Sequence, residues 1–411
     1  MENQAQERYR RNVARVADNT LTQLREDKNA SQGLRHFWDI LDDTFVKQIH
    51  TGGACIGSYC VMVPDELIYA LGFRPLRLCA GHSIAALMGD ELIPRDACPV
   101  VKASIGFHAM RTLPIYEQCG LAVLPMTCDA KRKCASLLTE YLTVIPLQIP
   151  AAKSDENFEQ LVENMWGLVG SLSSLTGAKL TNRALMRSVR EINAAQKEAY
   201  RLYGFLKKGC ISGSQVMAVM NSYCYDTPAV WTKQVELLNL YLELNAQAQN
   251  GGPRKKPRVF IAGAPVTFPN FKLPFLLESA GAQIVGDETC MAGRLLYDPV
   301  VPVDLSTPGI IRALTARYVS ACTCPVFDQM EDRLYNIEER LRFTDAEGII
   351  YHVLRGCTPY DYEFHAVEEL AGRLGIPILR VETDFSTEDV EQVRIRLEAF
   401  CEIIEQRRNA L

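Results

Sequence analysis

Cysteine is the residue type in this chain with the widest scope for chemistry, because 14 of the 411 residues carry a thiol. Cysteine thiolates bind soft metals and iron–sulfur clusters, and a cubane needs about three or four of them. The alternative for any single cysteine is a small, buried apolar side chain. A chain of this length can bury a full core, so it has no structural need for disulfides.

Several cysteines directly follow segments that are predicted to be strands. They are Cys60 after 54–59, Cys128 after 121–127, Cys290 after 283–289 and Cys357 after 348–356. Cys322 and Cys324 follow the stretch 314–321, and Cys98 lies in a loop-like segment at 93–99. Open α/β sheets bind ligands in the crevice outside the carboxyl ends of their strands. We therefore expect thiols from both halves of the chain to meet at a cleft.

An iron–sulfur cluster suits this pattern better than structural zinc. Zinc sites use closely spaced C-x₂₋₄-C pairs, whereas the chain offers only Cys322-Thr323-Cys324, Cys55-x₄-Cys60 and Cys128-x₅-Cys134. Helices predicted to start near Asp129 and Pro359 would direct N–H groups at an anionic cluster. A metal-free protein with buried cysteines is the alternative that spacing alone leaves open.

Other catalytic motifs are missing from the sequence. There is no G-x-x-x-x-G-K-[ST] phosphate loop, no G-x-G-x-x-G after a strand and no G-x-S-x-G elbow. The six histidines show no metal-ligand pairing. Glu66 and Glu363 are candidate acids or bases near the cleft, but acids in the first turn of a helix are common for electrostatic reasons alone.

Composition excludes several classes of protein. The chain is 48 % hydrophobic and 23 % charged, with a formal net charge of −5, which argues against a broad nucleic-acid or acidic-lipid surface. No apolar run approaches the roughly 18 to 20 residues of a membrane span. The segment 1–29 is polar and mixed in charge, unlike a secretory signal. A cytoplasmic protein is therefore expected.

The order of predicted elements indicates two α/β domains joined by a helical section. Strands are predicted at 54–59, 75–78, 121–126, 143–149, 259–262, 283–285, 348–354 and 377–381, with helices between them. We expect N-terminal helices over 1–50, a first α/β domain over 51–154, helices over 155–250, a linker at 250–257 and a second α/β domain over 258–411. The fold class is α/β, with two Rossmann- or flavodoxin-like domains that contain parallel sheets.

At the same cysteines the sequence resembles the 2-hydroxyacyl-CoA dehydratase and benzoyl-CoA reductase superfamily, and within it the branch of anaerobic reductases that contain a double-cubane cluster. The matching stretches are Gly57–Cys60, Pro64–Leu67, Leu78–Cys79, Pro94–Pro99, Lys102–Ser104, Thr127–Asp129, Lys131–Lys133, Gly286–Cys290, Cys322–Cys324, Gly356–Cys357 and Val381–Thr387. Together they span about 54–400. One departure is Ala130, where the family commonly has glycine.

The resemblance implies a set of cluster ligands. Three cysteines of each subunit hold one cubane in the superfamily, and their motif positions match Cys98, Cys128 and Cys357. The double-cubane branch holds two sulfide-bridged cubanes, of the [8Fe-9S] type, on six cysteines. The further ligands would come from Cys60, Cys290, Cys322 and Cys324, one of which is then not a ligand. Six cysteines lie outside the matched motifs: Cys55, Cys119, Cys134, Cys210, Cys224 and Cys401. Cys79 is expected to serve packing.

The resemblance also implies a reaction and partners. The chain would be a homodimeric iron–sulfur reductase that acts on a small substrate, with electrons from a separate ATP-hydrolysing iron–sulfur activator; ATP would bind only that partner. One alternative is a single-cubane subunit of a 2-hydroxyacyl-CoA dehydratase, which would pair with a second subunit. Another is a non-catalytic electron carrier.

Overall fold

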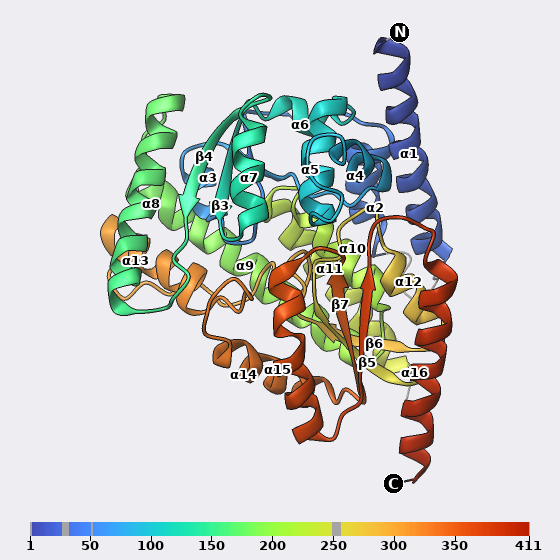
Figure 1. The fold of residues 1–411 in the computed structure, drawn as a ribbon. Coiled ribbons are helices and arrows are strands. Elements are labelled where there is room, and N and C mark those ends of the chain that lie inside the picture. Colours follow the sequence, from blue (N-terminus) through green and yellow to red (C-terminus); the bar gives the residue numbers. More distant parts are fainter. Residues whose placement is uncertain (1, 27–32, 51, 249–255, 411) are drawn as a thin grey trace.

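Two four-stranded parallel sheets, one from each half of the chain, form the frame of the protein. The computed structural model describes residues 2–26, 33–50, 52–248 and 256–410. In Figure 1 the first sheet lies in the upper half of the view and the second in the lower half. The α/β class with parallel sheets, predicted from the order of elements, is confirmed.

The first sheet has the strand order β2-β1-β3-β4. Its strands are β1 (Cys55–Ser58), β2 (Arg74–Arg77), β3 (Leu121–Met126) and β4 (Thr143–Gln148). The order reverses direction between β1 and β3, which pair in parallel. Such a reversal point is where open α/β sheets leave a crevice for a ligand.

The second sheet repeats this topology, with the order β6-β5-β7-β8. Its strands are β5 (Arg258–Gly263), β6 (Gln283–Asp287), β7 (Gly348–Leu354) and β8 (Ile378–Thr383). Every residue of β5 and β7 is buried. Central strands of a parallel sheet are covered on both faces, which explains why these two read as near-continuous apolar runs.

Helices cover both sheets and connect the two halves. They are α1 (Glu2–Glu26), α2 (Arg35–Leu41), α3 (Asp65–Ala70), α4 (Ser83–Gly89), α5 (Pro99–Met110), α6 (Pro114–Gln118), α7 (Asp129–Leu138), α8 (Asp155–Thr176), α9 (Asn182–Lys207), α10 (Gly213–Tyr223), α11 (Pro228–Ala248), α12 (Lys272–Ser279), α13 (Thr307–Thr315), α14 (Glu331–Thr344), α15 (Thr358–Leu374) and α16 (Val390–Ala410). Along the chain α8 to α11 come between β4 and β5, and Figure 1 shows α8 at the left edge of the molecule and α9, α10 and α11 nearer its centre.

Some boundaries differ from those predicted. Within the region 1–50, where helices were expected, α2 ends at Leu41 and is followed by one π-helical turn at Asp42–Val46. The helix predicted to start near Asp129 begins there and ends at Leu138. The predicted linker at 250–257 lies largely outside the described residues.

One hydrophobic cluster runs through both halves. It contains Leu76 of β2, Ile261 of β5 and Ile350 of β7, together with residues of α1, α2 and α10. Trp231 of α11 is fully buried in it, and its indole N–H donates to the carbonyl of Val219 at 3.1 Å. Because the cluster is continuous, the two sheets are held at a fixed separation.

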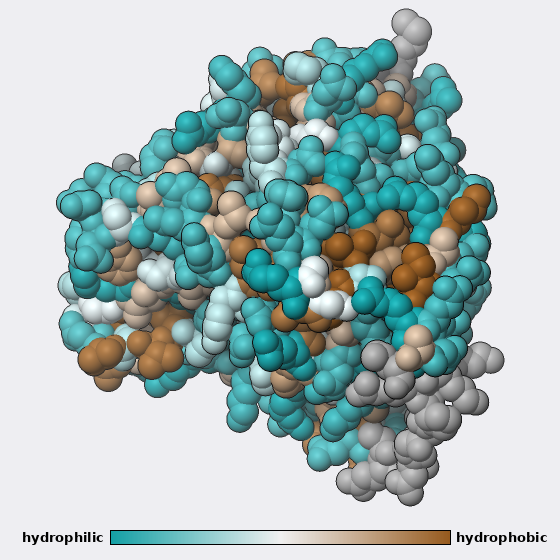
Figure 2. Space-filling view, turned by 60° about the horizontal axis from the view of Figure 1, so that its bottom comes forward, coloured by the Kyte–Doolittle hydropathy of each residue, from teal (hydrophilic) through white to brown (hydrophobic). Residues whose placement is uncertain are grey.

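The face seen in Figure 2 is mainly hydrophilic, with hydrophobic residues gathered in small patches. Within the part of the chain that the structure describes, none of the helices has both the length and the apolar character of a membrane span.

A buried histidine in α5 predicts a dependence of stability on pH. Burial lowers the pKa of His108 to about 4, and its Nε2 lies 2.5 Å from the hydroxyl of Tyr59. The unfolded chain binds a proton near pH 6.5, so stability is lost as the pH falls from 6.5 to 4, by about 3 kcal/mol for this group. Denaturant titrations at several pH values measure the loss. In His108→Gln the free energy of unfolding is expected to depend less steeply on pH between 6.5 and 4. An unchanged slope would contradict the assignment of this pH dependence to His108.

Candidate iron–sulfur site

The carboxyl ends of strands from both sheets open into one cavity. Cys60 and Cys128 each follow their strands, β1 and β3, by two residues, and Cys290 and Cys357 follow β6 and β7 by three. All four line a cavity of about 370 Å³, and so do Cys98 and Cys324. The expected meeting of thiols from the two halves of the chain is therefore present in the geometry.

Exposure separates these six cysteines from most of the others. All six are half-buried, whereas Cys79, Cys119, Cys134, Cys224, Cys322 and Cys401 are buried. A side chain that borders an internal cavity retains accessible surface. Cys55 and Cys210 are also half-buried but lie away from the cavity.

The structure separates the two members of the Cys322-Thr323-Cys324 motif. Cys324 lines the cavity, whereas Cys322 is 2 % exposed and packs in the hydrophobic cluster of the first half. Burial raises the pKa of the Cys322 thiol, partly offset by the charge of Arg294 and a hydrogen bond with Tyr297. Cys79, expected to serve packing, is 8 % exposed and nevertheless reaches the cavity wall. Burial raises its pKa to about 12.

Three helices begin at the cavity, each with a cysteine as its N-cap. Cys98 precedes α5, Cys128 precedes α7 and Cys357 precedes α15. Helix N-termini carry a partial positive charge and free N–H groups, so they stabilise a nearby anion. The pKa of Cys98 is lowered to about 7, first by a hydrogen bond with Cys357 and then, against burial, by the N–H groups of Val100 and Val101.

Buried cations lie beside these thiols, and one of them, Lys131, lines the cavity itself. Burial alone would lower the pKa of Lys131, in the first turn of α7, but the thiolates of Cys60 and Cys128 raise it above its usual value. Lys131 in turn helps to lower the pKa of Cys60 against the effect of burial. Lys131 belongs to one of the matching stretches named above, Lys131–Lys133. Nothing in the sequence indicated that its side chain would face the thiols.

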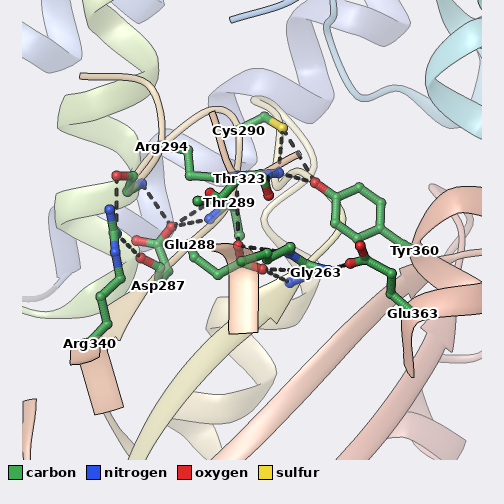
Figure 3. A network of polar contacts seen from close by, with 12 residues as sticks. Gly263, Asp287, Glu288, Thr289, Cys290, Arg294, Thr323, Arg340, Tyr360 and Glu363 are labelled. Atoms are coloured by element: carbon green, nitrogen blue, oxygen red, sulfur yellow. Dashed lines mark hydrogen bonds and ion pairs between the residues drawn. The ribbon is translucent and has the colours of Figure 1, made fainter. Parts of the chain in front are cut away.

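A second cation, Arg294, was not indicated by any motif. Its Nη2 donates to the Cys290 sulfur at 2.9 Å and to the hydroxyl of Tyr360, and its Nη1 donates to the carbonyl of Thr323 at 2.8 Å. Figure 3 shows the guanidinium reaching both Cys290 and Tyr360. Arg294 lies four residues after Cys290 in a loop. A loop lacks the regular spacing that predicts which side chains share a face, so the sequence did not indicate this contact.

Glu66 and Glu363, considered above as acids or bases, form contacts with other side chains away from the cavity. Glu66 is fully buried and accepts from the hydroxyl of Tyr318 at 2.7 Å. Glu363 forms an ion pair with Arg333. Neither side chain lines the cavity.

The donor set suits an iron–sulfur cluster, because it consists of thiols that surround one volume. A cubane spreads its ligands over several irons, so its cysteines surround a volume instead of converging on a point. Six sulfurs around a cavity, with cations and helix N-termini beside them, fit such an anionic group.

A glycine fixes the distance between the two halves at this cavity. Gly356 has φ +77°, and a Cβ atom there would overlap the carbonyl oxygen of Asp96, two residues before Cys98. Only glycine allows this approach, which brings the segments of Cys98 and Cys357 together.

Gly356→Ala is therefore expected to reduce bound iron and to destabilise the protein by about 1–3 kcal/mol. Iron analysis and urea unfolding measure both effects. Gly372→Ala is the matched control, because that glycine lies in the last turn of α15 with open space around its Cα. It is expected to stabilise the protein by about 0.5–1 kcal/mol. Equal behaviour of the two variants would refute the role of Gly356.

Comparison with known proteins agrees with the cysteine pattern. The family model for 2-hydroxyglutaryl-CoA dehydratase, D-component, matches residues 60–404. The chain belongs to this family. The resemblance to the dehydratase and benzoyl-CoA reductase superfamily is thereby confirmed. The match begins at Cys60 and includes every cysteine that lines the cavity.

Three relatives show which enzymes this member of the 2-hydroxyglutaryl-CoA dehydratase family resembles. The putative dehydratase subunit YjiM of Escherichia coli (strain K12) is 25 % identical over 85 % of this chain and 91 % of the relative. The (R)-phenyllactyl-CoA dehydratase beta subunit of Clostridium sporogenes is 23 % identical over 92 % of this chain and 100 % of the relative. A benzoyl-CoA reductase subunit of Thauera aromatica is 22 % identical over 84 % of this chain and 89 % of the relative. These relatives are subunits of dehydratases and of a reductase.

Proposed function

We propose that this chain is an iron–sulfur reductase with two sulfide-bridged cubanes, which carries out ATP-coupled, low-potential reduction of a small substrate. The observation that carries the proposal is the set of six half-buried cysteines that line one cavity, three from each half of the chain: Cys60, Cys98, Cys128, Cys290, Cys324 and Cys357. Six thiolates are the number that the double-cubane branch of the superfamily would require.

The residues divide into two ligand groups in this proposal. Cys98, Cys128 and Cys357, each at a helix N-terminus, would hold the cubane common to the superfamily. Cys60, Cys290 and Cys324 would hold the second. Cys322 would not be a ligand, because it packs against apolar side chains instead of lining the cavity.

The clusters, when bound, would supply low-potential electrons to a substrate in the cavity. The chain's own residues would bind the irons, offset the negative charge of the group through Lys131 and Arg294, and exclude bulk water. The cavity has a volume of about 370 Å³. Such a cavity, once it holds a cluster, leaves space for a small substrate only.

The partners follow from the same proposal. The sequence has no phosphate loop, so ATP would be hydrolysed by a separate iron–sulfur activator protein that delivers the electrons. Two copies of the chain would form the homodimer. A reducing cytoplasm would keep the thiols available for iron.

The runner-up is a single-cubane subunit of a 2-hydroxyacyl-CoA dehydratase. The names of two of the relatives above, a putative dehydratase subunit and a dehydratase beta subunit, favour it. In that case only Cys98, Cys128 and Cys357 would hold iron, and the chain would work with a second, different subunit.

The amount of iron distinguishes the two candidates. The protein is purified without oxygen, and iron and acid-labile sulfide are measured per chain. About eight irons, the content of two cubanes, support the reductase. About four irons favour the dehydratase subunit. No iron after anaerobic reconstitution would overturn both.

A further inference from the structure

We propose that Arg294 is a positioning residue that raises the reduction potential of the cubane bound by Cys290. It would do so through an N–H···S hydrogen bond to that cysteine and through its fixed positive charge. The inference rests on the proposed function, because it assumes that Cys290 is a cluster ligand. Hydrogen bonds to cluster sulfurs and nearby charge are among the factors that set the potential of an iron–sulfur site.

The guanidinium connects three segments at the second ligand group. One nitrogen, Nη2, contacts the Cys290 sulfur and the hydroxyl of Tyr360 at the start of α15. The other, Nη1, donates to the carbonyl of Thr323, the residue directly before Cys324. Arg294 is 2 % exposed, so these contacts are made away from water, where an electrostatic interaction is stronger.

A buried acid holds the arginine in place from behind. Glu288 is fully buried, and its Oε2 lies 3.8 Å from the Nε of Arg294. The same carboxylate accepts from the N–H of Gly263 at 2.9 Å and pairs with Arg333. Glu288 is therefore fixed on two other sides, and the terminal N–H groups of Arg294 reach Cys290, Tyr360 and Thr323 (Figure 3).

Glu288 compensates the charge of Arg294 on one side, and the two terminal nitrogens of the guanidinium donate to Thr323, Tyr360 and the Cys290 sulfur. Of these three acceptors only the sulfur becomes anionic, when it binds iron as a thiolate. A guanidinium that donates to sulfur stabilises the more negative state, which is the reduced cluster, and so raises the potential.

The effect is expected to be confined to one cubane. Among the cysteine sulfurs of the described residues, Arg294 donates only to that of Cys290. Lys131 acts instead on cysteines of both proposed groups, Cys128 in one and Cys60 and Cys324 in the other. Loss of Arg294 should thus lower one of the two cluster potentials and leave the other near its original value.

The test uses Arg294→Met, which removes charge and donor, and Arg294→Lys, which keeps the charge but not the two-pronged contact. Both are purified anaerobically as the full chain, and a redox titration followed by electron paramagnetic resonance measures each cluster's midpoint potential. We expect a shift to more negative potential of one cluster in the methionine variant. A smaller shift of the same sign is expected in the lysine variant.

The control is Arg340→Lys. Arg340 donates to the carbonyls of Asp287 and Gly293, in the same loop as Cys290, but faces a different cavity of about 790 Å³. It supports the loop without touching sulfur, so both potentials should stay at their wild-type values.

The outcomes separate the inference from the function on which it rests. Wild-type protein with about eight irons, but unchanged potentials in both Arg294 variants, would overturn the inference alone. Equal shifts of both clusters would also overturn it. If wild-type protein holds only about four irons, the proposed function fails first. If the methionine variant does not fold, the potentials of the lysine variant decide the question.

Discussion

Cys324→Ser is expected to reduce bound iron from about eight to about four per chain, because it removes one of the three thiolates of a cubane. Cys324 lines the cavity with Cys60 and Cys290, which we assign to the same cubane. Cys290→Ser should have the same effect. Iron and acid-labile sulfide analysis after anaerobic purification measures the loss, together with the cluster absorbance in the visible range.

The chain offers a matched control two residues away. Cys322→Ala changes a cysteine of the same motif that packs among apolar side chains outside the cavity. It should retain about eight irons, because no iron ligand is lost. If Cys322→Ala loses as much iron as Cys324→Ser, the ligand assignment is wrong. If Cys324→Ser keeps the full iron content, the second cubane is not held as proposed.

Glu288→Ala is expected to lower the free energy of unfolding by about 3–5 kcal/mol, because it leaves two buried arginines without their shared anion. Burial alone would raise the pKa of Glu288, but Arg333 and Arg294 outweigh burial and hold that pKa below its usual value. The carboxylate is thus charged in the folded protein and accepts hydrogen bonds from Arg333 and from the N–H of Gly263.

An exposed ion pair provides the comparison for this measurement. Glu159 pairs with Arg312 through two contacts of 2.6 and 2.7 Å, and both side chains are about half exposed. Glu159→Ala should lower the free energy of unfolding far less than Glu288→Ala, because solvent screens such pairs. Urea unfolding of the iron-free protein, followed by circular dichroism, measures both variants. A loss in Glu288→Ala no greater than in Glu159→Ala would show that the buried network does not contribute as described.

Much of the fold follows from local patterns. The strands at Leu121–Met126 and Gly348–Leu354 coincide with the predicted ranges, because continuous apolar runs between turn residues are typical of buried parallel strands. β6 extends to Asp287, beyond the predicted end at Val285, because Gly286 and Asp287 carry no apolar signal but still pair with β5. The π-helical turn after α2 likewise had no signal in the sequence.

The sequence alone determined that several cysteines follow predicted strands. This was enough to predict that their thiols meet, because a parallel sheet sends the carboxyl ends of its strands to one edge. Which cysteines border the cavity was decided only by tertiary structure. Cys322 and Cys324 are two residues apart in one loop, and packing against the first half buries one and leaves the other at the cavity.

The electrostatic setting of the site also came only from tertiary structure. Arg294 and Lys131 are ordinary cations in the sequence. The folded chain places one against the Cys290 sulfur and the other among the thiols of Cys60 and Cys128. The physical reason is that charge interactions depend on distance and burial, which are set by contacts between segments far apart in the chain.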